Sequence, residues 1–191
     1  AASKRGQRQT SLNYAERELA RPKVKIVRSK QKNKNKNEDM IAFIDTEVNP
    51  RTKKVADYGA VREDGAVLHS SSKADFDAFV SKCDTVCGHN IINFDLKYTS
   101  LRGNSTIVDT LFLSPLLFPK RPYHHLVKDD KLQVDELNNP VNDSMKARDL
   151  LNDEVAAWNQ LSDNRTEIYY YLLNETQEFG AFFKYGGRYP I

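Results

Sequence analysis

The sequence predicts an α/β domain in which a mixed β-sheet is flanked by helices. The orderly part of the chain begins at Met40, where three segments with strand character follow one another. The second and third are joined by Glu63-Asp64-Gly65, a turn sequence typical of an antiparallel hairpin. Beyond the hairpin, short apolar strands alternate with segments of helical periodicity, and the combination indicates a mixed sheet.

The expected strands are short apolar or β-branched runs bounded by polar and turn residues. The first contains four consecutive apolar residues, and the next two flank the Glu-Asp-Gly turn. The last two are short and each precedes a segment with helical character. The five expected strands are 40–45, 54–61, 66–70, 85–88 and 107–109.

The expected helices show apolar residues at helical spacing or are apolar stretches that end at proline. In 75–83 the apolar positions are 76, 79 and 80, and the stretch 111–118 ends at Pro119. Residues 142–152 form an amphipathic pattern with Met145, Leu150 and Leu151 on one side. The expected helical segments are 75–83, 90–101, 111–118, 124–131, 142–152, 154–161 and 167–183.

The charge distribution separates the first 39 residues from the rest. Residues 1–39 hold 12 Lys/Arg and 4 Asp/Glu, a balance of +8, whereas residues 40–191 hold 17 and 22, a balance of −5. The run 30–37 is polar, basic and of low complexity, so we expect residues 1–39 to be a flexible linker. This arm is either a phosphate-contacting tail or a tether left from an upstream segment. A folded α/β domain is expected at 40–153, and an aromatic-rich helical extension at 154–191.

Composition argues against several classes of protein. At 191 residues and 39% hydrophobic content, no stretch approaches the roughly 20 apolar residues of a membrane helix. We find no signal peptide and expect a cytoplasmic protein without membrane contact. Cys83 and Cys87 lack a second pair of ligands that would complete a zinc site, so we expect reduced thiols near the core.

The run Ile41–Glu47 carries the strongest functional signal. Asp45 and Glu47 follow four apolar residues and, two apart on a strand, leave the same face. Adjacent anions repel and lose hydration, which favours a cation between them, and oxygen ligands suit Mg²⁺ or Mn²⁺. The alternative is a pair that marks where the strand enters a solvated loop.

Three further aspartates have chemical interest. Asp95 follows Gly88-His89-Asn90 on an expected helix, and Asp143 lies in the first turn of the amphipathic helix, where the helix dipole alone favours an anion. Asp109 ends a strand before Thr110 and is expected to cap the next helix.

Taken in order, these motifs resemble the DEDD (DnaQ-like) superfamily of 3′→5′ exonucleases, which have a ribonuclease H-like fold. The resemblance covers residues 40–153: D-x-E, then G-H-N-x4-D, then a D-S-x3-A-x-x-L-L helix, with 48 residues from Glu47 to Asp95 and 48 from Asp95 to Asp143. It implies two Mg²⁺ or Mn²⁺ ions about 3.5–4 Å apart. Their ligands would be Asp45, Glu47, Asp95 and Asp143. The segment 113–130 also resembles exonuclease domains joined to RecQ-like or other DEAD-type helicases.

The residue expected to act as general base differs from the family pattern. In the family, this base is a His five residues before the last metal-binding Asp or a Tyr four residues before it, and Asp143 matches that last Asp. Asn138 and Asn139 occupy those positions, and an amide can orient water without accepting its proton. His124 and His125 are the candidate replacements, His124 being preferred. The alternative is that one packs against Tyr123 and the other is exposed to solvent. His89 is expected to support its loop.

The resemblance implies that single-stranded DNA or RNA 3′ ends are the substrate. Phe94 is a candidate for stacking on the terminal base, or else a core residue. The candidate nucleic-acid contacts are Phe94, Lys97, Lys128, Lys131, Lys146 and Asn138. The competing hypotheses are a nuclease-like domain that binds nucleic acid or docks a helicase without cutting, and a ribonuclease H-like endonuclease or integrase relative.

Overall fold

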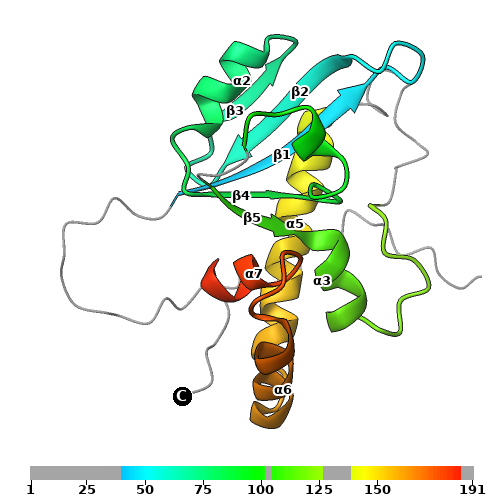
Figure 1. The fold of residues 1–191 in the computed structure, drawn as a ribbon, viewed down its shortest axis with the longest axis vertical. Helices are drawn as coiled ribbons and strands as arrows, with labels where there is room; N and C mark the ends of the chain where they lie inside the picture. The colour runs from blue at the N-terminus through cyan, green and yellow to red at the C-terminus, as the bar shows by residue number, and fades with distance from the viewer. Residues whose placement is uncertain (1–39, 102–104, 127–138, 186–191) are drawn as a thin grey trace, which may run out of the picture. The chain divides into compact units, whose positions relative to one another are not determined.

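A five-stranded sheet organises the residues that the computed structural model describes, namely 40–101, 105–126 and 139–185. In spatial order its strands are β3 (Val67–Ser70), β2 (Val55–Arg62), β1 (Ile41–Val48), β4 (Thr85–Gly88) and β5 (Thr106–Asp109). The pairs β3–β2 and β2–β1 are antiparallel, whereas β1–β4 and β4–β5 are parallel. The predicted α/β class with a mixed sheet flanked by helices is confirmed (Figure 1).

Helices pack on both faces of the sheet because the residues of β1 alternate between two hydrophobic cores. Ala42 and Ile44 belong to the core that contains Phe76 of α2 (Lys73–Val80). Ile41 and Phe43 belong to the other core. That second core takes residues from α3 (Thr110–Leu117), α5 (Pro140–Asn159), α6 (Asp163–Leu173) and α7 (Gly180–Tyr185).

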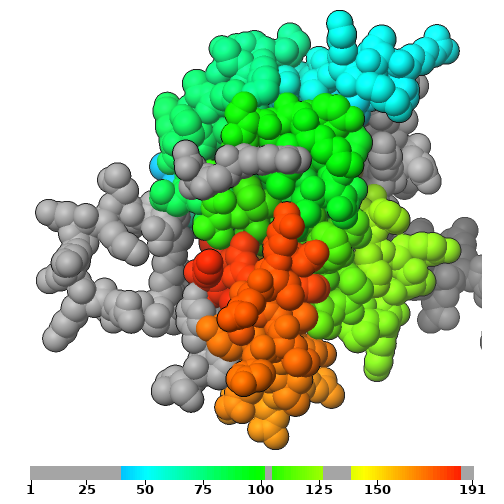
Figure 2. All heavy atoms as spheres, viewed as in Figure 1, coloured from blue at the N-terminus to red at the C-terminus, as the bar shows by residue number. Residues whose placement is uncertain are grey.

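Two helices that were predicted separately form one continuous helix in the structure, and a third predicted helix is divided into two. Segments 142–152 and 154–161 form the single 20-residue α5, so the expected limit between 153 and 154 falls inside a continuous helix. Segment 167–183 is divided into α6 and α7. The aromatic residues of the expected extension pack on the second core, where Trp158 lies edge-on to Phe182 and Phe183. In Figure 2 the orange and red C-terminal atoms lie against green atoms, and α7 contacts β5.

The helix predicted at 90–101 is wrong. Its first residues form turns, followed by the short 3-10 helix η1 (Asp95–Lys97). Asn90 has a φ of 66°, a left-handed conformation that no α-helix continues. The Asp109 carboxylate also accepts hydrogen bonds from the backbone N–H groups of Asn90 and Ile92, which fixes this irregular segment against the end of β5.

Other expectations fall partly beyond the described residues. Of the helical turns expected at 124–131, residues 124–126 are not helical, and 127–131 lie outside the described part. The linker expected at 1–39 also lies outside it. Cys83 and Cys87 are both free and buried, as expected. Within the described ranges, every helix is too short or too polar to cross a membrane.

Candidate metal centre

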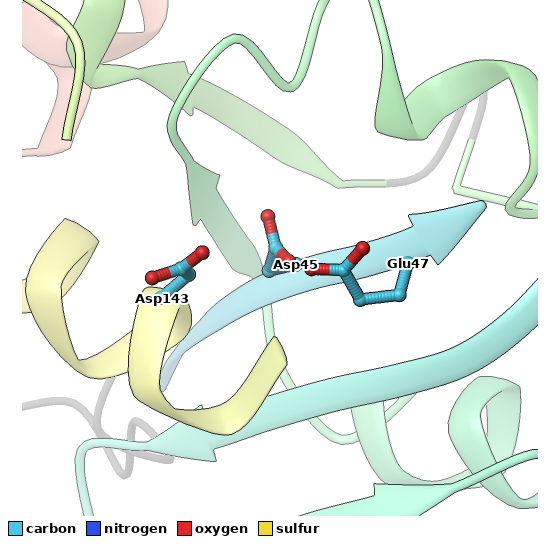
Figure 3. Close-up of side chains that lie close together, drawn as sticks. All are labelled: Asp45, Glu47 and Asp143. Carbon is cyan, nitrogen blue, oxygen red and sulfur yellow. The ribbon is translucent and has the colours of Figure 1, made fainter. Parts of the chain in front are cut away.

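Three carboxylates converge at the end of the central strand. Asp45 and Glu47 extend from one side of β1, and Asp143 faces them from the first turn of α5 (Figure 3). One carboxylate oxygen of each lies within 4.8 Å of the other two, and all three side chains are half-buried. This arrangement offers oxygen ligands and partial access to solvent, which suits a hard divalent cation.

The cluster depends on a close approach of α5 to the sheet. Gly59 of β2 pairs with Asp45, and a Cβ at this position would lie 2.2 Å from the carbonyl carbon of Pro140. Any side chain there would push the beginning of α5 away. Gly59 therefore lets Asp143 reach the two β1 carboxylates. A glycine inside a strand is the sequence signal for such an approach, although the sequence does not say which element approaches.

Two positive features of α5 lie close to Asp143. Asn139 caps α5 by accepting a hydrogen bond from the Val141 N–H, so the positive end of the helix lies beside Asp143. Lys146, one turn later, donates to Asp143 at 3.0 Å. This contact differs from the expected role of Lys146 as a contact to the nucleic-acid backbone.

Asp95 lies outside the converging group. It is 1% exposed and accepts hydrogen bonds from the backbone N–H of Thr46 at 2.9 Å and from its hydroxyl at 2.7 Å. Thr46 stands between Asp45 and Glu47, so its side chain leaves the opposite side of β1. Burial raises the pKa of Asp95 to about 7. The structure thus brings together three of the four expected ligands and ties the fourth to the strand that carries two of them.

Asp109 has the capping role that its position suggested. Its buried carboxylate accepts hydrogen bonds from Asn90, Ile92 and Leu111 and caps α3. Burial raises the pKa of this carboxyl group, and its three backbone donors oppose that effect.

The histidines occupy different environments. His124, the preferred base, is half-buried and its Nδ1 is hydrogen-bonded to Ser114 of α3 at 2.9 Å. His125 is exposed. His89 is half-buried at the end of β4, and burial lowers its pKa to about 4. His125 lowers this pKa further, whereas Asp143 raises it.

Two of the expected nucleic-acid contacts lie at the surface near Asp95. Phe94 is 38% exposed, and its ring centroid lies 5.4 Å from that of Tyr98. Lys97 is also exposed. Phe94 is therefore available for stacking and is not the core residue of the alternative. The remaining candidates, Lys128, Lys131 and Asn138, lie outside the described residues.

Comparisons of the chain with protein-family models, curated proteins and solved structures gave no match. The functional argument therefore depends on the residues and geometry described above.

Proposed function

We propose that this protein is a metal-dependent 3′→5′ exonuclease that hydrolyses the terminal phosphodiester bond of single-stranded DNA or RNA. The observation that carries the proposal is the convergence of Asp45, Glu47 and Asp143 into one oxygen-rich cluster. Asp143 is far from the Asp45–Glu47 pair in sequence, and all three residues lie in motifs that resemble those of the DEDD family. The ribonuclease H-like fold is part of the proposal, supported by a mixed sheet that has the acidic pair on its middle strand.

The donor set fits Mg²⁺ or Mn²⁺, because it consists of carboxylates near a helix N-terminus without sulfur ligands. Asp45, Glu47 and Asp143 would hold the cation, whereas Asp95, buried against Thr46 on the opposite side of β1, would support the strand that carries two of these ligands. When bound, such ions stabilise the charge that develops on the attacking and leaving oxygens.

The protein's own groups would orient and deprotonate the attacking water. His124 and His125 are the candidate bases: the Nδ1 of His124 is hydrogen-bonded to Ser114, which orients the ring and leaves Nε2 for the water, whereas His125 is exposed. Phe94 would stack on the terminal base, and Lys97 would contact the phosphate backbone. A helicase domain or protein remains a proposed partner that would supply single strands.

A second candidate function is a domain that binds nucleic acid or docks a helicase without cutting it. One observation favours it: Asn139, at a position where the family can have its base, is used to cap α5. The retained carboxylates argue against it, because anions that are brought together repel one another.

Cleavage of end-labelled oligonucleotides distinguishes the two functions. The wild type is incubated with 5′-labelled and 3′-labelled single strands in Mg²⁺, Mn²⁺ or EDTA, beside Asp45→Asn. Asp149→Asn is the matched control, because Asp149 is an exposed carboxylate of α5 outside the cluster. We expect the wild type and Asp149→Asn to shorten the oligonucleotide stepwise from its 3′ end when metal is present. Asp45→Asn should give no such products. Binding without cleavage in either metal would contradict the proposal and support the second candidate.

A further inference from the structure

Helix α6 has an apolar face that is exposed at the surface of the described part of the chain. Ile168, Tyr171 and Leu172 are 55%, 86% and 67% exposed, and together with Glu167 they line one surface pocket. Because these apolar residues are three and four positions apart, their side chains are neighbours on one side of the helix. Three of the six large apolar side chains that are exposed in the described part thus gather on α6, and such a patch marks an interaction surface.

The opposite face of α6 is used inside the molecule. Thr166 is 4% exposed, and Tyr169 and Tyr170 pack on the second core. The ring of Tyr169 stacks on Trp158 of α5 with 6.4 Å between centroids, and Tyr170 lies edge-on to Phe183. These contacts hold α6 in place, so its apolar face is a fixed surface.

Charged residues flank the apolar positions symmetrically. Arg165 and Glu175 are both exposed, Arg165 one turn before Ile168 and Glu175 one turn after Leu172. Asn174, which follows the last residue of α6, keeps helical backbone angles (φ −64°, ψ −23°), so Glu175 continues the path of the helix. The two apolar residues lie two positions on either side of residue 170, and the two charged residues five positions on either side. The spacing 165, 168, 172 and 175 is also that of a coiled-coil seam.

We propose that this face of α6 binds a second copy of the chain, with the two α6 helices antiparallel about a two-fold axis at residue 170. The axis brings Ile168 of each copy opposite Leu172 of the other. It also brings Arg165 of each copy opposite Glu175 of the other. The face is therefore complementary to itself in charge, as an isologous interface requires.

The interface is small and separate from the metal centre. An 11-residue helix is about 16 Å long, so one helix pair buries less than the roughly 1,200 Å² of a standard interface. We therefore expect a weak dimer with a Kd of about 10–100 µM. α6 packs at the C-terminal end of α5, whereas Asp143 lies in the first turn of α5 (Figure 1). The proposal is independent of the proposed exonuclease function.

Sedimentation velocity of the full chain, at concentrations that bracket this Kd, tests the apolar contact. We expect the wild type to change from monomer to dimer, whereas Leu172→Glu, which buries a charge against Ile168, should stay monomeric. Val67→Glu is the matched control, because it makes a similar change at a 51% exposed apolar residue of β3, and it should dimerise like the wild type. A wild type that stays monomeric would overturn the proposal, and so would equal dimerisation of Leu172→Glu.

Charge exchange tests whether the partner is a second, antiparallel copy. Arg165→Glu and Glu175→Arg each place like charges opposite one another twice in the dimer, so each should raise the Kd about 10-fold, and less at high salt. A mixture of the two variants restores opposite charges at both positions and should dimerise as tightly as the wild type. Both positions are exposed, and thermal melting shows that each variant is folded. A mixture that associates no more tightly than either variant alone would overturn the antiparallel pairing.

Discussion

Helix α5 carries two carboxyl groups in opposite environments, about three turns apart. Asp143, in its first turn, is half-buried, meets two other carboxylates and is paired with Lys146. Glu154 is fully buried, and neither of its carboxyl oxygens has a hydrogen-bond partner among the described residues. Burial, reinforced by Asp109, raises the pKa of Glu154 to about 10. The same helix thus holds an acid suited to a cation and an acid that is neutral at pH 7.

The comparison shows that the count of acidic residues says little about a metal site. Position decides their chemistry: Asp143 lies at the helix N-terminus beside Lys146 and two other carboxylates, whereas the apolar interior favours the protonated form of Glu154. Conservative amide substitutions at the two positions should therefore have very different effects.

The largest expected effect is the loss of activity in Asp143→Asn. An amide cannot supply the negative charge that a divalent cation requires, and the loss of several kcal/mol of stabilisation corresponds to about a 10³-fold lower kcat. Glu154→Gln, the matched control on the same helix, should retain activity within about 3-fold, because the wild-type side chain is already neutral. Single-turnover digestion of a labelled oligonucleotide measures both. Similar losses in the two variants would remove the distinction between the two environments.

The next effect concerns the position of Asp143. Gly59→Ala places a methyl group against the backbone of Pro140, so α5 must shift outward and the cluster must open. We expect a loss of about 1–3 kcal/mol in the free energy of unfolding. The half-saturating Mn²⁺ concentration should rise about 10-fold or more. Ala56→Ser, an exposed change on the same strand, is the control. Unchanged Mn²⁺ affinity in Gly59→Ala would show that this glycine does not position the cluster.

The smallest effect is on the pH dependence of stability. The pKa of Glu154 is higher in the folded state than its ordinary value of 4.5, so the folded state binds more protons between pH 4.5 and about 10. The contribution of Glu154 to stability is therefore complete below pH 4.5 and is lost as pH rises toward 10. Glu154→Gln lacks this loss and should gain at least about 1 kcal/mol relative to wild type between pH 5 and pH 8. Urea unfolding of both proteins at pH 5 and pH 8 measures this difference in stability. If the free energy of unfolding changed equally with pH in the wild type and in Glu154→Gln, the assigned effect of burial on Glu154 would be contradicted.

The regular elements could be predicted well from sequence because their patterns are local. The strands, the turn at Glu63–Gly65 and the capping role of Asp109 follow from apolar runs and short-range hydrogen bonding. The segment 90–101 could not be predicted, because its backbone is held by a carboxylate about 19 residues away in the sequence. A helical period alone gave no sign of this competing contact.

The residues of the candidate metal centre could be predicted from sequence where they belong to a recognisable motif. The D-x-E pair and Asp143 meet as expected, whereas Asp95 is engaged with Thr46, a contact that only the folded chain brings about. The hydrogen bond between Ser114 and His124 also forms only in the folded chain, and the choice between His124 and His125 as the base stays a prediction.

Titration of the protein with Mn²⁺ by isothermal calorimetry tests the central claim most directly, because it measures the cluster without any assumption about the substrate. We expect saturable binding in the wild type and in Glu154→Gln, and loss of that binding in Asp45→Asn and Asp143→Asn. Equal binding in all four proteins, or none in the wild type, would contradict the metal centre and the exonuclease function built on it.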